Sequence, residues 1–153
     1  MYRLVMLLLA ATPFVTFAAE LDHEHSKPIE RRKPILLKAE EAAHIRLEMR
    51  TFLSGVQKIV TGAAHNDMRM VAEAAQSVGM AAAHEVPAGL REKLPLEFKK
   101  LGHATHTGFD DLARDAASMA DPNLALKQLS QLMSNCISCH ATFRIETRAG
   151  GKH

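Results

Sequence analysis

Apolar residues recur every three or four positions in four stretches of the chain, which is the spacing of one face of an α-helix. These stretches span about 37–61, 67–83, 95–120 and 123–148. No stretch shows the two-residue alternation of a strand, and no hairpin turn signal separates runs of β-branched residues. The pattern predicts an all-α protein in which four amphipathic helices, most of them joined by short connections, pack as an antiparallel four-helix bundle.

The predicted apolar stripes are rich in Ala and Met and poor in large aromatic residues. The first stripe consists of Ile45, Met49, Phe52, Val56 and Ile59 or Val60. The last consists of Ala125, Leu129, Leu132, Cys136, Cys139 with His140, and Phe143. Because protein interiors are normally close-packed, such a thin core leaves room for a bulky apolar guest.

The N-terminal segment has the features of a secretory signal peptide. A positive start at Arg3 precedes a short apolar run that Pro13 breaks, and small residues surround a cleavage point after Ala18. An uncleaved anchor is the alternative, but the run is short for a membrane span, and no later stretch is apolar enough to be one. We therefore expect residues 1–18 to be removed and the protein to be exported to the periplasm of a Gram-negative bacterium.

The remaining boundaries follow from composition. Residues 19–36 are charged, contain two prolines and lack an apolar period, so we expect a flexible leader, in which His23 and His25 make an incomplete metal site. Residues 37–148 then form the helical domain, and 149–153 form a disordered tail.

Composition and motifs exclude several classes of function. The net charge of the 153 residues is only +2, the basic residues are scattered and aromatic residues are 5% of the chain, so no nucleic-acid surface is expected. No G-x-S-x-G elbow, P-loop or H-E-x-x-H motif is present. The adjacent acidic pairs at 40–41 and 110–111 point to different faces of their helices, so neither pair converges on a substrate atom. The sequence does not predict an enzyme.

The sequence "CISCH" at 136–140 contains both cysteines of the chain. A disulfide across three residues would add little stability in the chain-entropy model, and a helix does not readily hold its geometry. A thioredoxin-like pair belongs in a βαβ setting, and zinc would require further ligands. A disulfide, a redox pair and a zinc site therefore stay open as alternatives to the attachment of a cofactor, which the full motif C-x-x-C-H indicates.

C-x-x-C-H is the attachment motif of a c-type haem. Cys136 and Cys139 lie one helical turn apart, so both thiols can form thioethers with the two vinyl groups of one haem. His140 follows directly, and histidine is the usual proximal ligand of haem iron. We expect one covalent haem c, with His140 as its axial ligand.

A C-x-x-C-H motif in the last of four helices resembles the class II c-type cytochromes, the cytochrome c-prime family. The specific part of the resemblance is "CISCHATFR", and it implies that Phe143 and Arg144 lie close to the haem and its histidine. The match in the first helix is looser: the family often has a basic residue shortly before a haem-facing position, and "HIRLEM" offers Arg46 before Met49, which implies a place for Arg46 in the haem pocket. The resemblance further implies a homodimer formed through the first two helices.

The resemblance leaves two behaviours for the sixth position of the iron. Some members of the family are five-coordinate and bind NO or CO, whereas others place a methionine of the first helix on the iron and carry electrons. Met49 lies on the apolar stripe of the first helix and is our candidate for the sixth ligand. If the register differs by one turn, Ile45 or Phe52 faces the iron instead and leaves it five-coordinate.

Histidines provide a further alternative for the sixth ligand. His44 lies at the edge of the first stripe, and His103 and His106 lie on one side of the third helix. Overall, the sequence predicts a periplasmic monohaem cytochrome that exchanges single electrons with other periplasmic redox proteins. A five-coordinate NO- or CO-binding protein is the alternative.

Overall fold

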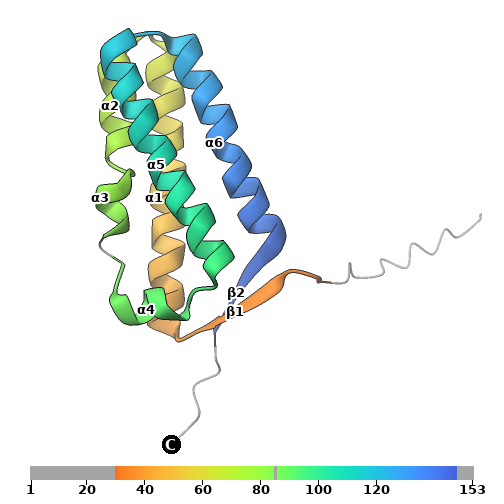
Figure 1. Cartoon of the computed structure of the whole chain (residues 1–153). Coiled ribbons are helices and arrows are strands. Elements are labelled where there is room, and N and C mark those ends of the chain that lie inside the picture. The colour runs from red at the N-terminus through yellow and green to blue at the C-terminus, as the bar shows by residue number, and fades with distance from the viewer. Residues whose placement is uncertain (1–29, 85, 148–153) are drawn as a thin grey trace, which may run out of the picture. The chain divides into compact units, whose positions relative to one another are not determined.

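The computed structural model describes residues 30–84 and 86–147 and is mostly helical (Figure 1), which confirms the prediction of an all-α protein. The elements, in chain order, are β1 (Lys33–Leu37), α1 (Ala39–Ala64), α2 (Met68–Gln76), α3 (Met80–Ala83), α4 (Ala88–Lys93), α5 (Leu96–Met119), α6 (Pro122–Thr142) and β2 (Phe143–Thr147). The predicted signal peptide, most of the leader and the C-terminal tail lie outside the described residues.

Local chemistry explains where two of the helices begin. Asp67 precedes α2, and its Oδ1 accepts the backbone N–H of Met70 at 2.9 Å. Asp121 precedes α6 in the same way and accepts the N–H of Asn123 at 2.8 Å. Both carboxylates satisfy N–H groups that have no partner within their helix. Asp67 is therefore the N-cap of α2.

Four helices, α1, α2, α5 and α6, lie side by side, and the short helices α3 and α4 occupy the connection between α2 and α5 (Figure 1). Small residues bring neighbouring helices close together. An ideal Cβ on Gly62 of α1 would lie 2.8 Å from Cγ2 of Val71 on α2. A Cβ on Gly108 of α5 would lie 2.7 Å from Cδ1 of Leu132 on α6. Both glycines allow approaches that a side chain would block.

Two short strands, which the sequence did not predict, join the two ends of the described chain. Strands β1 and β2 pair in parallel, with Lys33 opposite Phe143 and Leu37 opposite Thr147. The prediction that the last helix continues to 148 is wrong, because α6 ends at Thr142 and the chain then becomes extended at Phe143. The predicted leader is also too long at its C-terminal end, since residues 33–36 belong to β1.

The buried apolar residues form two separate clusters rather than one continuous core. The first cluster comprises Ile59, Ala63, Met68, Val71, Ala74, Ala75, Val78, Phe109, Leu112, Ala116, Ala125, Leu129 and Leu132. The second comprises Ile35, Leu37, Ala42, Ile45, Leu90, Leu94 and Phe143. Helix α1 passes through both, with Ile59 in one and Ile45 in the other, and the stretch between them lines a cavity.

Within the residues that the structure describes, no helix combines the length and the apolar character needed to cross a membrane.

Candidate functional site

A cavity of about 620 Å³ lies between α1, α5 and α6, and the segment that carries α3 and α4 closes part of its wall. We call it the main cavity. Its apolar lining includes Ile45, Met49, Phe52, Val56, Phe98, Leu101 and Phe109. Its volume falls within the range of about 300–1,000 Å³ that is typical of cofactor and small-molecule sites.

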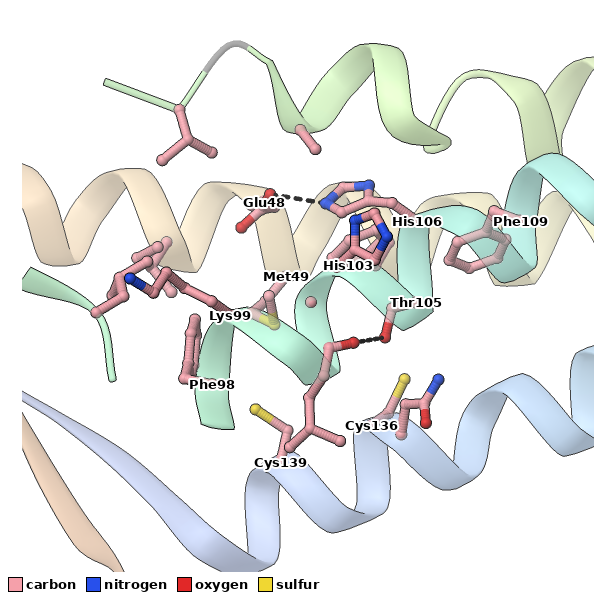
Figure 2. A pocket seen from close by; sticks show the side chains of 18 of the residues that line it. Glu48, Met49, Phe98, Lys99, His103, Thr105, His106, Phe109, Cys136 and Cys139 are labelled. Atoms are coloured by element: carbon pink, nitrogen blue, oxygen red, sulfur yellow. Dashed lines mark hydrogen bonds and ion pairs between the residues drawn. The ribbon is translucent and has the colours of Figure 1, made fainter. Parts of the chain in front are cut away.

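Both cysteines of α6 lie on the wall of the main cavity. Cys136 and Cys139 are half-buried, and Figure 2 shows both sulfur atoms directed from α6 into the cavity. Their spacing of three residues places them on the same face of the helix, one turn apart. The structure therefore brings the two thiols together at one apolar site.

The pKa values of the two thiols differ in direction from those of a thioredoxin-like redox dithiol. Burial raises the pKa of Cys136 above its ordinary value, and burial together with the charge of Cys136 raises the pKa of Cys139. Reactive cysteines of thioredoxin-like proteins instead have lowered pKa values and lie near helix N-termini. Here both cysteines are free thiols near the C-terminus of α6. Both thiols are therefore protonated at neutral pH.

Met49 reaches the main cavity from the opposite side. It is half-buried on α1, and Figure 2 shows its sulfur atom on the side of α1 that faces the cavity. Ile45 and Phe52, the residues that a shift of one turn would bring forward, also line the main cavity. All three residues that the sequence offered for the sixth position of the iron therefore lie on the wall that α1 forms.

His140 occupies the last turn of α6 and lies between the main cavity and a second, adjoining cavity of about 490 Å³. Met49, Phe98 and Cys139 line both cavities, so the two spaces adjoin at these residues. Four guanidinium groups line the second cavity, which we call the arginine cavity: those of Arg32, Arg46, Arg50 and Arg144. The main cavity is therefore mostly apolar, and the adjoining arginine cavity is lined by cationic residues.

The strand β2 supplies the end wall of the arginine cavity. Phe143 is buried there, and its ring packs edge-on against Phe98 with the ring centroids 5.7 Å apart. Arg144 donates from Nε to the backbone carbonyl of Arg32 at 3.2 Å, and its Nη1 contacts Glu146. These bonds hold the guanidinium of Arg144 at the edge of the cavity. Phe143, Arg144 and Arg46 thus lie beside Cys139 and His140.

A buried histidine forms the polar part of the main-cavity wall. His106 is only 4% exposed, and its Nδ1 donates to the carbonyl oxygens of Val78 at 2.9 Å and Gly79 at 3.0 Å. Its Nε2 lies 3.3 Å from the Glu48 carboxylate on α1 (Figure 2). Burial lowers the pKa of His106, but the hydrogen bonds to Glu48, Val78 and Gly79 outweigh burial and raise it overall.

The hydrogen bonds of His106 bear on the histidines that the sequence offered as alternative sixth ligands of the iron. Both ring nitrogens of His106 face acceptors, so its protonated form, which the raised pKa favours, has no nitrogen lone pair to offer a metal. His103 is exposed and lines the main cavity, whereas His44 is half-buried and does not line either cavity. Sequence reasoning singled out His106 as a helix-edge residue but missed its pairing with Glu48, because the two residues lie on different helices.

Sequence reasoning also missed Arg50 and Arg32. Arg50 follows Arg46 by four residues, so the helical period places both guanidiniums on one side of α1 and this signal was available. Arg32 reaches the site only through the pairing of β1 with β2, for which the sequence gave no local signal. Among residues 30–84 and 86–147, no group of three His, Cys, Asp or Glu side chains could hold a metal ion between them.

Comparison of the chain with protein-family models, with curated proteins and with solved structures gives no match. The function of the site is therefore inferred from its own residues.

Proposed function

We propose that this chain is a periplasmic monohaem c-type cytochrome, an antiparallel four-helix bundle with haem c held at its last helix, and that it carries single electrons. The observation that supports this most is the placement of both thiols, one turn apart, on the wall of a cavity of about 620 Å³. An isolated dithiol needs no cavity beside it, whereas a haem attached through two thioethers needs an apolar space of this kind.

The residues of the site fit a haem c. The apolar walls suit the ring system, and Cys136 and Cys139 would hold it through thioether bonds. His140, in the adjoining turn, would be the axial ligand. A haem also carries two carboxylates, and the arginine cavity offers Arg46, Arg50 and Arg144 with Arg32 for these charges. Bound in this way, haem supplies an iron that alternates between the ferrous and ferric states.

The sixth ligand decides between electron transfer and ligand binding. Thioether and imidazole ligation favours ferrous iron and raises the reduction potential, which suits an electron carrier. Met49 offers the thioether from the wall opposite α6. His106 cannot compete, because both of its ring nitrogens are already hydrogen-bonded.

The test is the absorption spectrum of the haem-loaded protein and of the variant Met49→Ala. We expect low-spin bands and no response to CO in the parent protein, and high-spin bands that shift with CO in the variant. The variant Met133→Ala is the matched control, because Met133 also lines the main cavity but lies on α6, and its spectrum should stay low-spin. Protein without a Soret band after maturation with haem-attachment enzymes would refute the haem proposal.

The second candidate is a five-coordinate protein that binds NO or CO. One observation favours it: the main cavity continues past Met49 along α1 to Phe52, Leu53 and Val56, which leaves space for a diatomic ligand on that side. In this case the parent protein itself is high-spin and binds CO rapidly, and Met49→Ala changes little. The same spectra therefore distinguish the two candidates.

A further inference from the structure

Large apolar side chains are exposed along the flanks of α1 and α6 that border the main cavity. Leu53 is 69% exposed and Met133 is 40% exposed, yet both line this cavity. They therefore mark its mouth, which opens between the two helices. Since α1 and α6 make far less contact with each other than α5 makes with α6, the helices leave this side of the site accessible.

The exposed apolar surface extends along both helices from the mouth. Val60 follows Leu53 by seven residues on α1, so the two share a face. On α6, Leu126 precedes Met133 by seven residues and Ile137 follows it by four. These five side chains, which we call the mouth patch, account for half of the ten large apolar residues that are exposed in the described chain. Apolar side chains gathered in this way mark interaction surfaces.

Cationic groups border the mouth patch. Arg46 and Arg50 are exposed on the same flank of α1, seven and three residues before Leu53. Both also line the arginine cavity. Helix α6 contains no Asp or Glu in its 21 residues.

The carboxylates of α1 lie elsewhere. Glu41 pairs with Lys93 of α4, and Glu48 pairs with His106 of α5. Glu40 lies in the first turn of α1, on a different side of the helix from Arg46 and Leu53. The surface around the mouth is therefore apolar at its centre and positive at its edge.

We propose that the mouth patch is the docking site for a soluble redox protein with an acidic surface around an apolar centre. Charge complementarity is the reason for this choice of partner. The four arginines of the arginine cavity outnumber the two carboxylates of a haem, so positive charge remains at the mouth, where it would attract carboxylates and steer the encounter. A second copy of this chain fits poorly, since a symmetric contact would pair this positive surface with itself and would offer the arginines no matching carboxylates. The electron-transfer role of the partner rests on the proposed function, whereas the docking of an acidic protein does not.

The test uses a plant-type ferredoxin, a small acidic one-electron carrier, as the probe. It is titrated at low salt into isotope-labelled, haem-loaded protein while amide resonances are recorded. We expect the shifted amides to cluster on the two flanks that carry the mouth patch. The double variant Arg46→Glu/Arg50→Glu, used only where its Soret band shows the same haem content as the parent protein, should weaken binding at least about tenfold.

The matched control is Lys58→Glu/Lys127→Glu, which makes the same change in net charge on α1 and α6, the two helices that carry the mouth patch. Lys58 and Lys127 are exposed but turned away from the mouth patch, so binding should weaken less than about threefold. Equal weakening in both double variants, or shifts spread over other faces, would overturn the proposal. So would binding to phosphatidylglycerol vesicles without binding to ferredoxin, or concentration-dependent dimerisation that the arginine variant abolishes.

Absorption spectra of the same samples keep the two proposals apart. If the Soret band is missing but the amide shifts still map to the mouth patch, the haem proposal fails and the docking surface stands. If the spectra are those of a cytochrome and no shifts appear, the docking proposal alone fails.

Discussion

Replacement of Glu48 by Gln tests whether the buried pair on the cavity wall holds α1 and α5 together. The Nε2 of His106 lies 3.3 Å from the Glu48 carboxylate, and the side chains are 5% and 20% exposed. Gln keeps the shape and one acceptor oxygen but removes the charge. Hydrogen bonds to charged groups contribute about 1.5–3 kcal/mol. Because the contact is long and Glu48 keeps some solvent, we expect a loss of about 2 kcal/mol in the free energy of unfolding.

The direction of the pH dependence follows from the raised pKa of His106. A histidine whose pKa is higher in the folded state stabilises the fold below its unfolded value, here 6.5, and loses that contribution as the pH rises through the folded pKa. The ion pair with Glu48 is one cause of the raised pKa. The difference in stability between the parent protein and Glu48→Gln should therefore be larger at about pH 6 than at about pH 9.

The assay is urea unfolding of the haem-loaded proteins, followed by far-UV circular dichroism at both pH values. Glu73→Gln is the control, because Glu73 pairs with Arg69 one turn away on α2 and both side chains are mostly exposed. Such surface pairs contribute about 0.3–0.5 kcal/mol. The reasoning is refuted if Glu48→Gln costs no more than Glu73→Gln, or if its cost is the same at the two pH values.

The remaining predictions concern helix packing and the thiols. Gly62→Ala should destabilise the fold by about 1–3 kcal/mol, because the new Cβ would lie 2.9 Å from the backbone carbonyl oxygen of Asp67. Unfolding curves measure this loss. The control is Gly89→Ala, which should not destabilise the fold because its Cβ would meet nothing within 4 Å. In protein made without haem, iodoacetamide should alkylate Cys136 and Cys139 with a pH midpoint above that of free cysteine, about 8.5, because burial raises both pKa values. A midpoint below that value would indicate an activated dithiol instead.

Short-range chemistry was the part of the fold that the sequence could predict. Asp is a typical N-cap residue, and Asp67 caps α2; proline is typical of a helix start, and Pro95 is the N-cap residue of α5. The end of α6 was not predictable in this way, because Phe143 continues the apolar period of the helix. What turns the chain at Phe143 is the pairing of β2 with β1, which brings Lys33 opposite Phe143 across more than one hundred residues. No local pattern contains that contact.

The candidate site was likewise predictable where its signal is local in sequence, and not where it depends on contacts between helices. The spacing of Cys136, Cys139 and His140 is a local motif and could be recognised directly. The pairing of Glu48 with His106 depends on how α1 packs against α5, so it was visible only in the structure. Arg46 and Arg50 were predictable in part. The helical period puts them on one side of α1, but only the structure shows that they lie beside His140.

The course of α1 through the two apolar clusters gives the strongest structural reason to expect an apolar ligand. Its stripe is continuous in sequence, and the ends, Ile45 and Ile59, are buried by protein. The middle of the stripe, at Met49, Phe52 and Val56, is equally apolar but only partly covered. These residues line the cavity that separates the clusters, and both thiols of the chain lie on its opposite wall. Apolar groups left uncovered in the interior lose their packing contacts, and a ligand held by those thiols would restore them.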